Sequence, residues 1–146
     1  MSWQPHITVA TLVQDGERFL FVEEHKAGRD VLNQPAGHLE AGETLRQAAL
    51  RETLEETAWS VALTGVSGIY LYTAPSNGVT YQRVCFSAHP LRHDPHRALD
   101  DGILRAVWLT RDELAAAANR WRSELVLRCL DDYLERGAYP LDVVCD

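Results

Sequence analysis

The sequence predicts an α+β fold in which a mixed β-sheet is packed between α-helices, an α/β/α sandwich. Two hairpin signals, Asp15-Gly16 and Asn77-Gly78, each separate segments that are prone to form strands. Helix-forming residues run over 45–57, and further helical segments follow the last strand-prone segment. The chain has 146 residues, so we expect a single domain that spans 1–146.

The first third of the chain predicts a hairpin followed by a loop. Residues 6–13 are rich in β-branched side chains, and residues 18–23 would form the returning strand. We expect a looser stretch from there to residue 33. The segment 34–43 contains two glycines and a proline, which favours a loop with a short extended piece over a helix.

The helix over 45–57 carries a clear start signal. Thr44, followed three residues later by Gln47, has the form of a capping box, in which each side chain satisfies a free backbone amide. Three strand-prone segments follow, at 61–72, 81–88 and 105–109. The first of these is interrupted by two glycines.

The end of the chain turns helical. Thr110 and Glu113 form a second capping box, which predicts a helix through about residue 118. A last helix is expected over 123–136, and Gly137 is a suitable stop.

Composition and charge narrow the class of protein. The formal net charge is -7 and the pI is about 5.3, which argues against a nucleic-acid-binding surface. We see no targeting segment and no apolar run of the ~18 residues that cross a bilayer, so we expect a cytoplasmic protein with no membrane partner. The spacing of Cys85, Cys129 and Cys145 fits neither a disulfide framework nor a zinc site, and we expect Cys85 to be a buried core residue.

Three carboxylates in the first helix indicate a functional site. Glu52, Glu55 and Glu56 stand at i, i+3 and i+4, so their side chains share one helix face and repel one another. A solvated acidic face is the common explanation for such a run. Here a glycine-containing loop with Glu43 precedes the helix, and Arg51 lies within it. That junction favours a site for a hard divalent cation such as Mg²⁺.

Gly37, Glu43, Arg51-Glu52 and Glu55-Glu56, at their spacing, resemble the Nudix box of the Nudix hydrolase family, here over 37–59. The order of hairpins and late helices also resembles the Nudix fold. Thr53 departs from the box where a bulky aliphatic residue is usual, and Ala58 departs where a glycine usually ends the helix.

The resemblance implies a metal-dependent hydrolase of phosphoanhydride bonds. It implies Mg²⁺, or Mn²⁺, held by Glu52, Glu55 and Glu56, with the Gly37 backbone carbonyl as a further ligand. It leaves open whether Glu55 or Glu56 is the general base. It implies that Glu43 and Arg51 orient the loop and the helix.

Segments at 5–10, 33–40 and 137–141 resemble the NudJ phosphatase branch of the family. That branch implies hydrolysis of nucleoside di- and triphosphates with release of phosphate, or of hydroxymethylpyrimidine pyrophosphate. We expect a monomer or a homodimer. Two alternatives stay open. One is an ADP-ribose or nucleoside-diphosphate-sugar pyrophosphatase, since Pro75 lies sixteen residues after Trp59. The other is a non-catalytic nucleotide-binding module.

Residues outside the helix give weaker indications about substrate. Arg83 could bind a phosphate through its guanidinium or could simply face solvent from its strand. His38 stands beside Gly37 and could contact substrate. Tyr70, Tyr72 and Trp108 could stack on a base, although core packing is the commoner role of aromatic residues. Asp100-Asp101 precedes the final strand and could supply an outlying acid, although we treat it as a surface pair.

Overall fold

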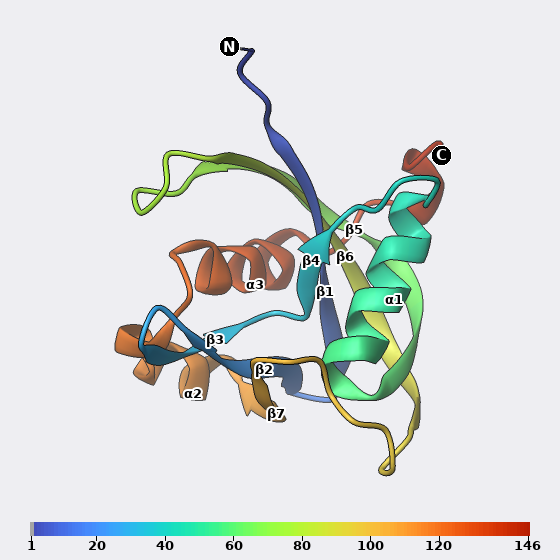
Figure 1. Cartoon of the computed structure of the whole chain (residues 1–146). Helices are drawn as coiled ribbons and strands as arrows, with labels where there is room; N and C mark the ends of the chain where they lie inside the picture. The colour runs from blue at the N-terminus through green and yellow to red at the C-terminus, as the bar shows by residue number, and fades with distance from the viewer. Residues whose placement is uncertain (1) are drawn as a thin grey trace.

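Residues 2–146, which the computed structural model describes, form a sheet covered by helices on both faces (Figure 1). The seven strands are β1 (His6–Asp15), β2 (Arg18–Lys26), β3 (Arg29–Asn33), β4 (Ala36–His38), β5 (Trp59–Thr73), β6 (Thr80–His93) and β7 (Ile103–Thr110). The helices are α1 (Leu45–Thr57), α2 (Arg111–Ala116) and α3 (Leu125–Arg136), with short 3-10 turns at Ala118–Arg120 and Leu141–Val143. The predicted α+β fold with a mixed sheet between helices is confirmed.

The sheet divides at β1, and this division makes room for a pocket. The strand order is β3-β2-β1-β6-β5, with β4 also paired to β1 and β7 to β2. The start of β1 pairs with β4, at Thr8 opposite His38, whereas its end pairs with β2, at Asp15 opposite Arg18. β1 and β6 are parallel, and the other pairings are antiparallel.

Successive strand residues point to opposite faces of the sheet. Neighbouring residues of one strand therefore pack against different helices. Val9 packs in a buried cluster with Ala48 and Ala49 of α1. Its neighbour Ala10 packs in a second cluster with Val126 of α3 and other buried residues. Cys85 is fully buried in this second cluster, as expected. Among residues 2–146, no helix is both long enough and apolar enough to cross a membrane.

Helix α1 begins and ends where the sequence predicts. Thr44 and Gln47 form the reciprocal capping box, and Ala58 ends the helix in the left-handed conformation, at φ 63°. An alanine pays roughly 1 kcal/mol for that conformation. Thr53 is fully buried, and its hydroxyl donates to the Ala49 carbonyl at 2.7 Å and lies 2.8 Å from the Thr11 hydroxyl. A hydrogen-bonded polar pair therefore occupies the space that an aliphatic side chain would fill.

The expectation of a looser stretch up to residue 33 is wrong. β2 runs on to Lys26 and pairs with β3 through a tight turn at Ala27-Gly28, where both residues have positive φ. Alanine rarely adopts that conformation, so the sequence does not signal the turn. The expected interruptions in β5 are β-bulges, with register shifts that end at Gly65 and Gly68.

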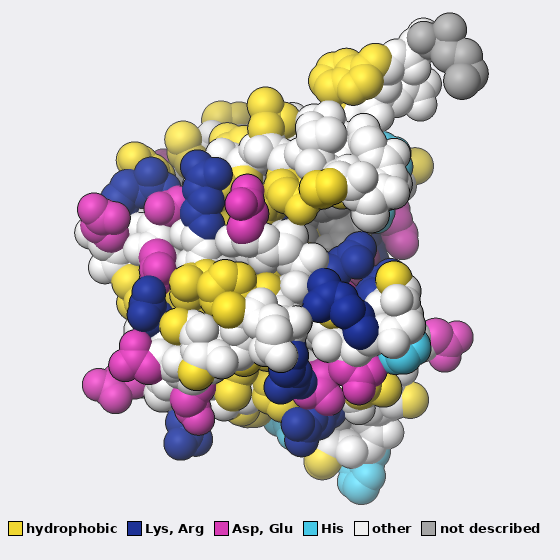
Figure 2. Space-filling view, turned by 90° about the vertical axis from the view of Figure 1, so that its left-hand side faces the viewer, with side chains coloured by type: hydrophobic (Ala, Val, Ile, Leu, Met, Phe, Trp, Pro, Cys, Tyr) yellow, Lys and Arg dark blue, Asp and Glu magenta, His cyan; other side chains and the backbone are white. Residues whose placement is uncertain are grey.

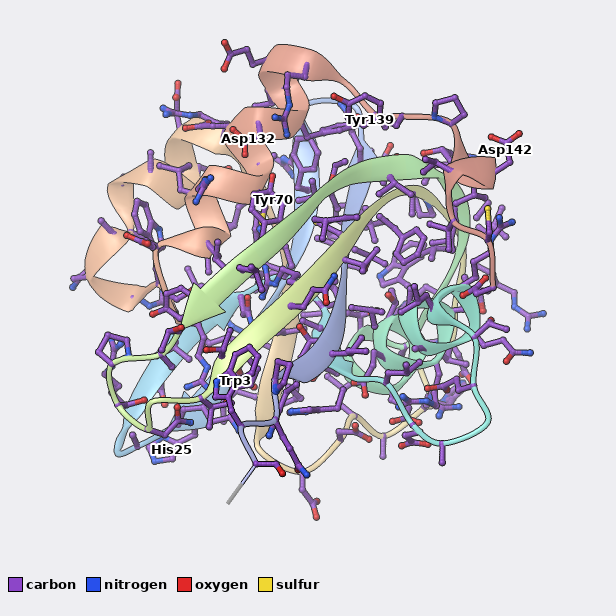
Figure 3. All side chains as sticks on the ribbon, turned by 90° about the horizontal axis from the view of Figure 1, so that it is seen from above. Trp3, His25, Tyr70, Asp132, Tyr139 and Asp142 are labelled. Carbon is purple, nitrogen blue, oxygen red and sulfur yellow. The ribbon has the colours of Figure 1, made fainter. Side chains whose placement is uncertain are left out.

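The helical end also differs slightly from expectation. α2 ends at Ala116 and the chain continues as a 3-10 turn, while α3 begins at Leu125 rather than at residue 123. Tyr70 lies beside Asp132 of α3 (Figure 3), and its hydroxyl donates to that carboxylate at 2.7 Å. Tyr70 is therefore a buried packing residue, the commoner of the two roles considered for it.

Candidate active site

Three carboxylates from two separate segments converge beside α1. Oxygens of Glu52, Glu55 and Asp100 all lie within 4.8 Å of one another. Asp100 belongs to the loop before β7, and its backbone amide donates to the Glu55 carbonyl at 3.0 Å. Asp100 is exposed, as expected of a surface residue, but this backbone contact holds it beside the acidic face of α1, which favours the alternative of an outlying acid.

Two carboxylates of this group, Glu52 and Glu55, have raised pKa values. Burial raises the pKa of Glu52, and the charges of Glu55 and Asp100 raise it further, while Arg51 opposes the change. Burial likewise raises the pKa of Glu55, followed by the charge of Asp100. A bound cation would relieve this repulsion, and oxygen ligands of this kind suit Mg²⁺ or Mn²⁺.

Glu56 is more deeply buried than these three carboxylates. It is only 9% exposed, and its Oε1 accepts a hydrogen bond from the Ala36 amide at 2.9 Å. Burial raises the pKa of Glu56 to about 8 against the effect of that hydrogen bond, with the nearby charges of Glu52 and Glu24 adding to the rise. In the metal-free protein this carboxyl group therefore holds its proton at neutral pH.

Arg51 ties the loop before α1 to the acidic face of the helix. Its Nε donates to Glu43 Oε2 at 2.6 Å and its Nη2 to Glu43 Oε1 at 2.9 Å, a bidentate ion pair. Its Nη1 donates to Glu52 Oε1 at 2.7 Å, and its Nη2 to the His38 carbonyl at 3.1 Å. The guanidinium thus holds Glu52 in one position and lowers the pKa of Glu43.

Gly37 lies directly against the carboxylate of Glu52. A Cβ atom added to Gly37 would stand 2.2 Å from Glu52 Cδ and within 2.4 Å of both carboxylate oxygens. Gly37 pairs with Val9 in the ladder between β4 and β1, so its backbone cannot easily retreat. The glycine of the box is therefore required by the close approach of Glu52.

A cavity of about 710 Å³ opens next to these residues, within the volume range of small-molecule sites. Its acidic lining includes Glu24, Glu52 and Glu56, and its basic lining consists of Lys26, Arg29, Arg83 and Arg122. Tyr72, Tyr81 and His38 also line it. Lys and Arg side chains, in dark blue, gather beside the middle of the face that Figure 2 shows.

The weaker substrate candidates fall in different places. Arg83 lines the cavity but is 93% buried, so the alternative of a solvent-facing strand arginine is wrong. The ring of His38 lies 3.0 Å from that of His6 (Nε2 to Nδ1), and burial followed by the charge of His6 lowers the pKa of His38. Trp108 packs edge-on against Trp59 and is not among the cavity residues.

Sequence reasoning missed one acid near the site, Glu24, and left Asp100 as a surface residue that could supply an outlying acid. Glu24 is only 9% exposed and lines the cavity, and a β-bulge between Glu23 and Glu24 interrupts the pairing of β2 with β7. A signal was available, because Glu24 follows buried Leu20 and Val22 at strand spacing, on the same face. No comparable local signal marks Asp100.

Comparisons with known proteins agree with this geometry. The family model described as NUDIX domain matches residues 4–129. A protein named Phosphatase NudJ, from Escherichia coli (strain K12), is 36% identical over 144 residues, 99% of this chain and 93% of the relative, and the Shigella flexneri protein of that name matches equally.

Solved structures show the same relationship. The structure titled NUDIX hydrolase from Nitrosomonas europaea has a TM-score of 0.95 and 44% identity, with 98% of this chain and 97% of that chain covered. A UDP-X diphosphatase shares the fold, with a TM-score of 0.74 at 19% identity, covering 95% of this chain and 68% of that chain. The family match over most of the chain, together with these relatives, shows that the chain belongs to the Nudix hydrolase family.

Proposed function

We propose that this enzyme hydrolyses a phosphoanhydride bond in nucleoside di- and triphosphates, or in a related small diphosphate such as hydroxymethylpyrimidine pyrophosphate, with Mg²⁺ as its metal ion. The observation that carries the proposal is the convergence of Glu52, Glu55 and Asp100 beside a cavity that Glu52 and Glu56 line. Mn²⁺ is the expected substitute, because it accepts the same oxygen ligands.

The residues present fit a hard divalent cation. All the donors are carboxylate oxygens, and Arg51, the nearby cation, is already bonded to Glu43 and Glu52. We propose that Glu52, Glu55 and Glu56 hold the metal, with Asp100 joining them and the Gly37 carbonyl as a further ligand. When bound, the ion would neutralise phosphate charge and lower the pKa of a water molecule.

The protein's own residues would position the ligands and receive the proton. Arg51 and Gly37 fix the carboxylate of Glu52, one through a hydrogen bond and the other by leaving space. Glu55 or Glu56 would accept the proton of the attacking water. The Ala36 amide occupies one oxygen of Glu56 and leaves its second oxygen available for that role.

The comparisons support the nucleotide-like substrate class. The relatives in Escherichia coli carry the name Phosphatase NudJ, and the shared identity extends over 99% of this chain. The cavity volume of about 710 Å³ suits a molecule of nucleotide size.

A product assay tests the proposal. The enzyme is given nucleoside tri- and diphosphates, hydroxymethylpyrimidine pyrophosphate and ADP-ribose, with Mg²⁺ or with EDTA, and orthophosphate is measured separately from pyrophosphate. We expect Mg²⁺-dependent release of orthophosphate from several nucleotides. Turnover of ADP-ribose alone, yielding AMP, would contradict the proposed substrate class. Binding without turnover of any compound would contradict the hydrolase itself.

Two neighbouring acids provide a matched pair of variants. Asp100 belongs to the carboxylate group, whereas Asp101 is exposed and outside it. We expect Asp100→Asn to raise the Mg²⁺ concentration needed for half-maximal rate, and Asp101→Asn to leave it unchanged. Equal effects of the two substitutions would contradict the placement of Asp100 beside the metal.

A further inference from the structure

Arg83 is a buried cation that is held by neutral groups. It is 7% exposed, and its Nη1 donates to Gln34 Oε1 at 3.0 Å and lies 3.8 Å from the Cys129 sulfur. Its Nη2 donates to Asn33 Oδ1 at 3.2 Å. Within residues 2–146 no carboxylate oxygen lies within 4.0 Å of its guanidinium nitrogens.

Such an arrangement is costly in the free protein. An arginine cannot release its proton at physiological pH, and a buried charge without a counter-ion is unfavourable. The guanidinium is nevertheless kept in place, since the Gln34 side chain that accepts from it is itself anchored by donating to the Val126 carbonyl at 2.6 Å. The missing counter-charge points to an anionic ligand.

The cavity identifies the chemistry of that ligand. Arg83 lines the same cavity as Glu52 and Glu56, where the proposed metal ion and phosphate chain would lie. We propose that Arg83 binds a phosphate group of the substrate directly, without a metal ion between them. A guanidinium offers several donors in a planar fork, which matches the oxygens of a phosphate. This inference rests on the proposed function and adds a specificity residue to it.

Two substitutions test whether Arg83 binds the anion: one removes its charge, and the other neutralises it. Arg83→Met removes the charge. Asn33→Asp keeps Arg83 and places a carboxylate where the amide oxygen now lies 3.2 Å from its Nη2, which supplies an internal counter-ion. Arg92→Met is the control, because Arg92 is an exposed arginine near the far end of the same strand, β6. Asn33 also lines the cavity, so its carboxylate variant would repel an anion by itself, and the loss of affinity in Arg83→Met is the result that identifies the guanidinium.

The readout is the affinity for inorganic pyrophosphate in EDTA, measured by calorimetry at about pH 6. A mildly acidic pH favours the neutral form of the Cys129 thiol, whose pKa is lowered, first by a hydrogen bond with Cys85 and, against burial, by Arg83. We expect the Kd to rise at least about tenfold in Arg83→Met and in Asn33→Asp, and to stay unchanged in Arg92→Met. Thermal unfolding of each variant confirms that it is folded.

The same variants are then compared in Mg²⁺-dependent turnover, where we expect KM to rise more than kcat falls. Unchanged pyrophosphate affinity in Arg83→Met, or no pyrophosphate binding by the unsubstituted enzyme, would overturn the role of Arg83. Nucleotide hydrolysis by the unsubstituted enzyme would still support the proposed function in that case. Pyrophosphate binding through Arg83 without any hydrolysis would overturn the proposed function and leave this inference standing.

Discussion

Replacing Gly37 by alanine should disable the site by displacing one carboxylate. The added Cβ would stand 2.2 Å from Glu52 Cδ, whereas ordinary van der Waals contact begins at 3.4 Å. The carboxylate must therefore move by about 1.2 Å, the difference between these two distances. It must also strain or break its 2.7 Å hydrogen bond with Arg51.

A displacement of this size is large for a metal ligand. Coordination distances to Mg²⁺ are held near 2.1 Å, and a misplacement of about 1 Å in an active site can cost about 10²-fold in rate. We therefore expect Gly37→Ala to lower Mg²⁺-dependent turnover by about 10²-fold. The free energy of unfolding should change by less than about 1 kcal/mol, because the clash falls on the end of a flexible side chain.

The assay measures turnover over a range of Mg²⁺ concentrations, together with urea unfolding. A double-mutant cycle with Glu52→Gln separates a local effect from a general one. If Gly37→Ala acts through Glu52, the double variant should be little worse than Glu52→Gln alone. Turnover of Gly37→Ala within about threefold of the unsubstituted enzyme would refute the reasoning, and so would fully additive losses.

Four further predictions concern α1 and its C-cap. Glu56→Gln should lower turnover at least ~10²-fold. The pKa of Glu56 is about 8 in the folded protein, against an ordinary value of 4.5 for an unfolded chain. The metal-free protein should therefore lose stability as pH rises from 4.5 through 8, measured by urea unfolding in EDTA. Glu56→Gln should weaken this trend. Thr53→Val should cost about 1–3 kcal/mol in urea unfolding by leaving the Thr11 hydroxyl unpaired, and adding Thr11→Val should recover part of it. Ala58→Gly should change the free energy of unfolding by less than about 0.5 kcal/mol, because two effects nearly cancel. Glycine relieves about 1 kcal/mol of backbone strain, and the loss of a buried methyl group costs about 0.8 kcal/mol.

Each set of substitutions has a contrary result. Near-normal turnover of Glu56→Gln would remove Glu56 from the proposed metal and base residues. Additive costs of the two threonine substitutions would show that their hydroxyls do not depend on each other. A gain of about 1 kcal/mol from Ala58→Gly would show that the Ala58 methyl group contributes little to packing.

Features that depend on short stretches of sequence were predictable. The start of α1 follows from the capping box at Thr44 and Gln47, because these residues satisfy backbone amides within one turn of the chain. The hairpin turns at Gly16 and Gly78 follow from the positive φ that glycine tolerates. The box residues and their family follow from fixed spacings along the chain.

The positions of Asp100, Glu24 and Arg83 were decided by tertiary structure. Asp100 reaches Glu55 only because the loop before β7 folds back onto α1, and nothing near Asp100 in the sequence encodes that contact. Arg83 stands beside neutral Asn33 and Gln34 only because the strands diverge at β1 and enclose the cavity. Local sequence specifies backbone conformation through interactions within a few residues, whereas the charge balance of a site depends on which distant segments the sheet brings together.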